Sequence, residues 1–180
     1  MMSLRERLEI PLSKKKLMMA LIVSVGFAVG GVFMLLNPAL VDDPILATPG
    51  LTFFTGLVSV PIFGMIAVYL TRKLMDKTPG LLVDTIGVVD NSGIVSIGPV
   101  PWNDVERISL EEENRRVFLV IVLKNPQDYI AKQTNVFKRK LMRMNNRMYG
   151  TPFLISASTL KVSNEELLQI LTDYLGASRV

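Results

Sequence analysis

The sequence contains no cysteine and no histidine among its 180 residues. Without cysteine there are no disulfide bonds and no thiolate metal sites, and without histidine there are no imidazole ligands and no nucleophile–histidine pair. Acidic residues are absent between Asp128 and Glu165. Charged residues of either sign are absent from two apolar runs, 17–36 and 51–70. Common catalytic and metal-binding chemistries are therefore excluded, and the unusual features that remain are a basic segment and the two apolar runs.

Each apolar run is 20 residues long. A helix of that length spans about 30 Å, which is the thickness of the hydrocarbon core of a bilayer. We therefore predict two transmembrane helices, 17–36 and 51–70, joined by a short extracytoplasmic loop, 37–50. Because neither run contains Asp, Glu, Lys, Arg or His, an ion or proton path is disfavoured.

Basic residues lie on both outer flanks of the apolar pair, whereas the loop 37–50 has none. These residues are Arg5, Arg7, Lys14, Lys15 and Lys16 before the pair and Arg72, Lys73 and Lys77 after it. The positive-inside rule predicts a multi-pass protein of the cytoplasmic (inner) membrane with both termini in the cytoplasm. A cleaved signal peptide is disfavoured, because the first run is too long, no A-x-A site follows it, and a second run comes next.

Small residues recur in the first run, where Gly26 and Gly30 form a G-x-x-x-G pattern. Small residues allow helix backbones to approach closely within a membrane. We expect this pattern to pack the first span against the second, and self-association of two copies through Gly26 and Gly30 is the alternative.

The segment 1–16 is a cytoplasmic basic segment with three competing interpretations. Apolar residues alternate at positions 8, 10 and 12, which is typical of a half-buried strand. Ser3 with Glu6 would instead cap a short helix. A solvated basic tail is the favoured interpretation.

The region 78–180 follows a linker, 71–80, and its pattern predicts an α+β domain. Short apolar segments bounded by turn residues predict strands at 81–83, 86–90, 94–97, 105–110, 116–123 and 153–156. Ser163 and Glu166 form a capping box that begins a terminal helix, 164–175. This domain is expected on the cytoplasmic side.

A basic amphipathic segment interrupts the predicted strands. Asn125 and Pro126 favour a helix start and Gly150 a helix end, while 134–136 is a weak point that would divide the helix. Its apolar stripe consists of Ile130, Phe137, Leu141, Met144 and Met148, and its basic residues are Lys132, Lys138, Arg139, Lys140, Arg143 and Arg147. We expect the stripe to pack on the domain's own sheet and the basic side chains to face anionic lipid headgroups or a partner. A protein partner or a second copy bound through the stripe is the next interpretation, and nucleic acid is disfavoured.

Evidence for an enzyme is weak. Ser158 and Lys161 match the S-x-x-K pattern of serine–lysine nucleophiles, but no companion motif accompanies it. No P-loop, G-x-G-x-x-G or H-E-x-x-H motif occurs. The adjacent Asp42 and Asp43 lack the further oxygen ligands of a cation site. We therefore predict no catalysis, no cofactor and no metal site.

Residues 80–110 resemble the opening of bacterial pleckstrin-homology-like (PH-like) domains. The resemblance rests on a D-x-x-G-type turn between two short strands and on a tryptophan followed by an acidic residue and apolar positions. The residues concerned are Asp84, Gly87, Trp102, Asp104, Val105, Ile108 and Leu110. With the two spans and the pattern LKNP…YGTP (123–126 and 149–152), the whole chain is similar to a family of uncharacterised bacterial two-span membrane proteins.

This resemblance implies a two-helix transmembrane hairpin followed by a PH-like β-barrel or sandwich with a basic helical insertion and a C-terminal helix. The PH fold has seven strands, whereas the pattern after residue 80 predicts six, so residues 8–12 would supply the extra strand. The first hairpin, 81–90, has no Lys or Arg. Recognition of specific phosphoinositide headgroups is therefore not implied.

The expected function is that of a non-enzymatic, membrane-anchored binding or scaffolding module at the cytoplasmic membrane surface. The alternative is a small regulatory or accessory subunit of a larger membrane complex that associates through its transmembrane helices. The expected partners are the lipid bilayer and anionic headgroups, with a second copy or a membrane protein as the alternative.

Overall fold

The computed structural model describes residues 7–39, 48–93, 95, 97–113 and 116–179. The chain divides into two compact units, one made of residues 1–13 together with 78–180 and the other made of residues 14–77. Ser3 and Glu6, which would cap a short helix, lie outside the described residues, as do Asp42 and Asp43.

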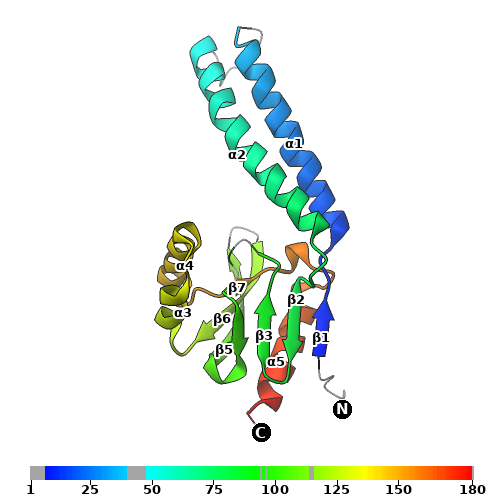
Figure 1. The fold of residues 1–180 in the computed structure, drawn as a ribbon, viewed down its shortest axis with the longest axis vertical. Helices are drawn as coiled ribbons and strands as arrows, with labels where there is room; N and C mark the ends of the chain where they lie inside the picture. The colour runs from blue at the N-terminus through cyan, green and yellow to red at the C-terminus, as the bar shows by residue number, and fades with distance from the viewer. Residues whose placement is uncertain (1–6, 40–47, 94, 96, 114–115, 180) are drawn as a thin grey trace. The chain divides into compact units, whose positions relative to one another are not determined.

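The unit 14–77 is a pair of helices, α1 (Lys14–Leu36) and α2 (Pro49–Met75), which pack side by side (Figure 1). Among the described residues, these two helices are long and apolar enough to cross a membrane. The predicted spans 17–36 and 51–70 lie within them. Thr48 caps α2 by accepting a hydrogen bond from the Leu51 amide (3.3 Å). Both helices also include basic residues that flank the apolar runs, such as Lys14 and Arg72.

The other unit contains antiparallel sheets. One sheet has the order β1 (Arg7–Ile10), β2 (Leu81–Asp84), β3 (Gly87–Asp90) and β4 (Pro99–Pro101), and another has the order β5 (Val105–Glu113), β6 (Arg116–Leu123) and β7 (Leu154–Ile155). Within the described residues the sheets do not close into a barrel. The α+β class is therefore confirmed, whereas the PH-like identity of the fold stays a prediction.

The N-terminal segment contributes a strand to this unit. β1 pairs with β2 so that Arg7 lies opposite Asp84 and Ile10 lies opposite Leu81. Ile10 is only 3% exposed, and the next apolar residue, Leu12, bridges to Leu160. For residues 7–10 the favoured solvated tail is therefore wrong and the strand is correct, because the alternating apolar side chains have a core to pack into.

Strand β4 lies just after the segment 94–97. The segment 94–97, predicted as a strand, includes residues 94 and 96, which lie outside the described residues, and residues 95 and 97 are not in a strand. The described strand is β4, where Pro99 pairs with Val89 and Pro101 pairs with Gly87. Prolines lack an amide donor and are tolerated at a sheet edge, which is the position of β4.

The turn between β2 and β3 explains why Asp84 and Gly87 stand where they do. Asp84 Oδ1 accepts hydrogen bonds from the amides of Ile86 (2.8 Å) and Gly87 (2.9 Å), and the Trp102 indole donates to the Asp84 carbonyl oxygen (2.8 Å). A Cβ atom on Gly87 would lie 2.2 Å from the carbonyl oxygen of Val100 on β4. The turn therefore requires a hydrogen-bond acceptor at its start and no side chain at its end.

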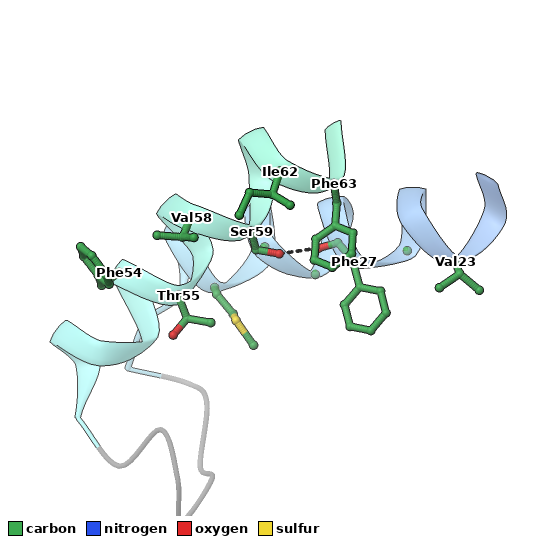
Figure 2. Close-up of a pocket in the computed structure, with 12 residues that line it drawn as sticks. Val23, Phe27, Phe54, Thr55, Val58, Ser59, Ile62 and Phe63 are labelled. Carbon is green, nitrogen blue, oxygen red and sulfur yellow. Dashed lines mark hydrogen bonds between the residues drawn. The ribbon is translucent and has the colours of Figure 1, made fainter. Parts of the chain in front are cut away.

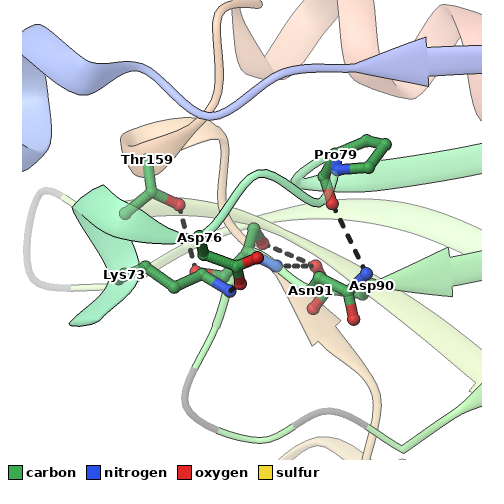
Figure 3. Close-up of polar contacts among 7 residues, drawn as sticks. Lys73, Asp76, Pro79, Asp90, Asn91 and Thr159 are labelled. Atoms are coloured by element: carbon green, nitrogen blue, oxygen red, sulfur yellow. Dashed lines mark hydrogen bonds and ion pairs between the residues drawn. The ribbon is translucent and has the colours of Figure 1, made fainter. Parts of the chain in front are cut away.

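A second polar turn follows β3. The buried Asp90 accepts hydrogen bonds from the amide and the hydroxyl of Ser92 (2.7 and 2.6 Å) through Oδ1, as Figure 3 shows. Asn91 Nδ2 donates to the Pro79 carbonyl oxygen (3.4 Å), and Thr159 Oγ1 donates to the Ser92 carbonyl oxygen (3.4 Å). These bonds join three distant chain segments around the turn.

The terminal helix α5 (Asn164–Ala177) covers the unit's core. The predicted capping box is confirmed, since Ser163 and Glu166 exchange side-chain and backbone hydrogen bonds. α5 contacts β2, β5 and β6, and it buries Leu167 and Leu171 completely.

Short 3-10 turns, η1 (Trp102–Asp104) and η2 (Ala157–Thr159), join the remaining elements. Helices α3 (Pro126–Lys132) and α4 (Val136–Tyr149) lie between β6 and β7 in the sequence (Figure 1).

Candidate functional site

The basic segment forms the helices α3 and α4, with a break at the weak point that the sequence predicts. Asn135 caps α4, because its side-chain oxygen accepts a hydrogen bond from the Lys138 amide (3.0 Å). Gly150 ends α4 in the left-handed region, with φ of 73°, a conformation that glycine adopts without strain. The sequence thus determines both ends of α4 locally.

Two tyrosines attach α3 and α4 to the body of the unit. Tyr129 donates a hydrogen bond to Asp104 Oδ2 (2.6 Å), and Tyr149 donates one to the carboxylate of Glu113. The Tyr149 ring also meets the Phe118 ring edge to face, with 5.2 Å between centroids. Burial, assisted by the hydrogen bond to Asp104, raises the pKa of Tyr129, and the hydrogen bond to Glu113 raises the pKa of Tyr149. Both phenols therefore stay protonated donors well into the alkaline range.

The attachment fixes which side of α4 faces inward. Met142 is completely buried and Tyr149 is half-buried, while Phe137, Met144 and Met148 are 64%, 50% and 56% exposed. The expectation that the whole apolar stripe packs on the sheet is therefore wrong. Ile130 is buried as predicted and Leu141 is half-buried, but Phe137, Met144 and Met148 leave at least half of their surface uncovered.

Polar side chains occupy much of the inward side of α4. Asn145 and Asn146 are half-buried, and the side-chain oxygen of Asn146 has no hydrogen-bond partner among the described residues. A cleft of about 540 Å³ lies along the C-terminal half of α4, where Met144, Asn145 and Met148 line it together with Phe118 and Leu154. The packing of α4 against its sheet is therefore incomplete.

The structure divides the six predicted basic residues into groups. Lys140, Arg143 and Arg147 are exposed and fall on one side of α4 by their spacing of three and four residues. None of these three forms an ion pair with any described residue. Lys138 and Arg139 are half-buried, and Lys132 lies on α3 with its ammonium 5.6 Å from the centre of the Tyr129 ring. The exposed group borders the exposed apolar side chains.

Gly26 and Gly30, the other predicted site residues, line an apolar groove of about 760 Å³ between α1 and α2 (Figure 2). A Cβ atom on either glycine would meet nothing within 4 Å. The helices instead approach closely at Gly31 and Gly56, where a Cβ atom on Gly56 would lie 2.6 Å from the Gly31 carbonyl oxygen.

Contacts nearer the middle of the groove hold the helices together. Ser59 Oγ donates to the Phe27 carbonyl oxygen (3.3 Å), and the rings of Phe27 and Phe63 stack with 4.7 Å between centroids (Figure 2). The groove at Gly26 and Gly30 is thus open, although α1 and α2 contact each other beside it.

Neither the S-x-x-K pattern nor the acidic side chains form a site in the described part of the chain. Ser158 lies in η2 and Lys161 follows it, both with exposed side chains, and no hydrogen bond joins them in the described part of the chain. The structure describes no group of three or more His, Cys, Asp or Glu side chains that would hold a metal ion.

No protein-family model, curated protein or solved structure matches the chain. The functional interpretation therefore depends on the residues themselves.

Proposed function

We propose that the chain is a two-span protein of the cytoplasmic membrane that holds a PH-like domain at the cytoplasmic surface as a non-enzymatic binding or scaffolding module. The observation that carries this proposal is the pairing of β1 with β2, together with the exposure of apolar side chains on α1 and α2.

Exposed apolar side chains surround both long helices. Phe27, Phe54 and Met65 are more than half exposed, and few residues in either helix are buried. The core helix of a soluble protein buries such side chains, and a large exposed apolar surface marks a site of contact with protein or membrane. The hydrocarbon core of a bilayer would cover the exposed apolar side chains of such a helix pair.

The β1–β2 pairing gives independent support for the topology. β1 precedes α1 and β2 follows α2, yet both strands belong to one sheet. This pairing supports two crossings, because two crossings return the chain to the side of the membrane from which it started. The basic flanks then favour the cytoplasmic side.

The strand count supports the PH-like part of the proposal. The seven strands in the described part of the chain equal the number in the PH fold, and β1 supplies the strand missing after residue 80. α5 lies where the closing helix of such a domain is expected. The separate sheets favour the sandwich version of that expectation over a barrel.

Cysteine labelling tests the topology directly, because the chain has no cysteine of its own. Asp43→Cys, in the loop, and Thr172→Cys, on the exposed side of α5, are expressed separately in intact bacterial cells. A membrane-impermeant maleimide should label Asp43→Cys in intact cells and Thr172→Cys only after permeabilisation. Labelling of Thr172→Cys in intact cells would contradict the proposal.

The alternative, an accessory subunit that binds a membrane complex through its helices, is favoured by one observation. The groove at Gly26 and Gly30 is open and apolar. Filling it with Gly30→Ile should remove a membrane protein that co-purifies with the detergent-solubilised chain. Gly64→Ile is the control, since Gly64 also has open space but lies outside the groove. Equal co-purification with both variants would count against this alternative.

A further inference from the structure

We infer that α4 inserts its exposed apolar side chains into the interfacial region of a bilayer that contains anionic lipid. We call Val136, Phe137, Met144 and Met148 the insertion face of α4. The inference rests on the proposed function, because the membrane-spanning pair would keep the domain close to a bilayer. It goes further, because it assigns the contact to apolar side chains rather than to charge alone.

Several apolar side chains of α4 are exposed, while two of its amides lie on the inward side. The insertion face is exposed, with Val136 70% and Phe137 64% exposed, whereas Asn145 and Asn146 are half-buried against the unit. A surface helix in water normally buries its apolar stripe and exposes its amides. The observed arrangement suits an outer medium that is itself apolar.

The charges next to the insertion face select an anionic surface. Lys140, Arg143 and Arg147 border it, and no acidic residue occurs on α4. Apolar residues beside a row of Lys and Arg are typical of helices that lie in the plane of a membrane interface. Anionic headgroups attract each such cation that lies near the surface.

Other occupants fit the insertion face less well. A second copy docked through the same face would bring two rows of cations together, because α4 carries no acidic residue to pair with them. A nucleic acid would contact the basic side chains and leave Phe137 and Met148 in water. Only a surface that is both apolar and anionic matches all the exposed residues.

The covalent link to the proposed membrane helices raises the effective concentration of the bilayer near α4. The linker from the end of α2 at Met75 to the start of β2 at Leu81 is short. A tethered domain meets the bilayer as an intramolecular partner, so that weak attraction is enough for docking. Tyr149 and Met142 hold the inward side of α4. Val136 and Phe137 are left exposed, and Met144 and Met148 are partly exposed at the rim of the cleft.

Spin labelling of the full chain tests the inference. Met148→Cys on the insertion face and Thr172→Cys on the exposed side of α5 are each labelled with a nitroxide. Each chain is placed in nanodiscs of phosphatidylcholine alone or of phosphatidylcholine mixed with phosphatidylglycerol. Accessibility of the label to oxygen, which concentrates in lipid, is compared with accessibility to a water-soluble nickel chelate.

The label on Met148→Cys should favour oxygen over the nickel chelate in the anionic discs, and this preference should weaken in phosphatidylcholine alone. The label on Thr172→Cys should favour the nickel chelate in both. If the Met148→Cys label favours the nickel chelate in anionic discs, or if labels at Met148 and Val136 are both shielded from the two reagents as in a protein contact, the inference is overturned. If the Met148→Cys label prefers oxygen equally in both kinds of disc, anionic lipid is not required for insertion.

If the proposed two-span topology is wrong, the experiment gives a different result. If α1 and α2 do not span a bilayer, the chain fails to enter the discs, and neither label reports on lipid. Val136→Cys provides a second position on the same face, outside the cleft that Met148 lines, so that a local effect at Met148 does not decide the result.

Discussion

Replacing Ile10 with alanine tests whether the N-terminal strand is part of the folded unit. Ile10 is 3% exposed on β1 and lies opposite the fully buried Leu81. Truncating a buried isoleucine to alanine removes its transfer free energy and leaves a cavity, which destabilises proteins by about 2–5 kcal/mol. We take about 3 kcal/mol for Ile10→Ala, since an edge strand can partly collapse onto the space.

The single tryptophan provides the assay. Trp102 is 2% exposed, stacks on Tyr174 and belongs to the same unit as β1, whereas neither α1 nor α2 contains tryptophan. Its fluorescence therefore follows unfolding of that unit in the detergent-solubilised full chain. At about 4 °C per kcal/mol for a unit of this size, Ile10→Ala should lower Tm by about 12 °C.

Glu9→Ala is the matched control, because Glu9 neighbours Ile10 on the same strand but points into solvent. Its ion pair with Arg7 (3.2 Å) is largely exposed, so its loss should change stability by less than about 1 kcal/mol. If both variants melt at the same temperature, β1 does not pack on the sheet, and the topological reasoning from the β1–β2 pairing fails with it.

Two further predictions concern the sheet and the attachment of α3. Gly87→Ala should destabilise the unit by about 1–3 kcal/mol, because its Cβ would lie 2.2 Å from the Val100 carbonyl oxygen, whereas Gly93→Ala, whose nearest atom is 3.8 Å away, should not. Equal urea midpoints, followed by Trp102 fluorescence, would contradict this. The pKa of Tyr129 is raised in the folded chain by burial and by Asp104, so its contribution to stability is present below about pH 10 and is lost as the pH rises further. Tyr129→Phe should therefore make the alkaline decline in Tm shallower, and an unchanged decline would refute the assignment.

Local signals in the sequence were sufficient to predict several elements. The absence of charge over 17–36 and 51–70 predicted the long helices, and the Ser163–Glu166 pair predicted the start of α5. Gly150 and the weak point at 134–136 predicted the end and the beginning of α4. These signals act through hydrogen bonds and backbone preferences within a few residues, so a single sequence carries them completely.

The rotation of α4 could not be predicted in this way. Periodicity shows that Phe137, Met144 and Met148 share one side, but it does not say which side faces the core. The hydrogen bond from Tyr149 to Glu113, on a distant segment, and the burial of Met142 decide that question. One signal was available in the sequence: Met142 and Tyr149, seven residues apart, define a second, narrower apolar side of the helix.

The pairing partners of β1 and β4 could not be predicted from the sequence either. The alternation at residues 8, 10 and 12 is too short to separate a strand from a tail, and only the exposed edge of β2 makes it a strand. Prolines within a segment count against a strand by local rules, but β4, which contains Pro99 and Pro101, pairs on one side only and does not need their missing amides.

In the proposed two-span topology, the β1–β2 pairing links the folding of the domain to the insertion of the helices. β1 is synthesised before α1 and β2 only after α2, so the sheet cannot be completed until the chain has passed through both helices. A chain that crossed the membrane only once would place β1 and β2 on opposite sides. Strand β2 would then present an unpaired apolar edge, which favours aggregation. The same edge is exposed in any fragment that begins at residue 78, so measurements of binding by this domain require a chain that retains residues 7–13.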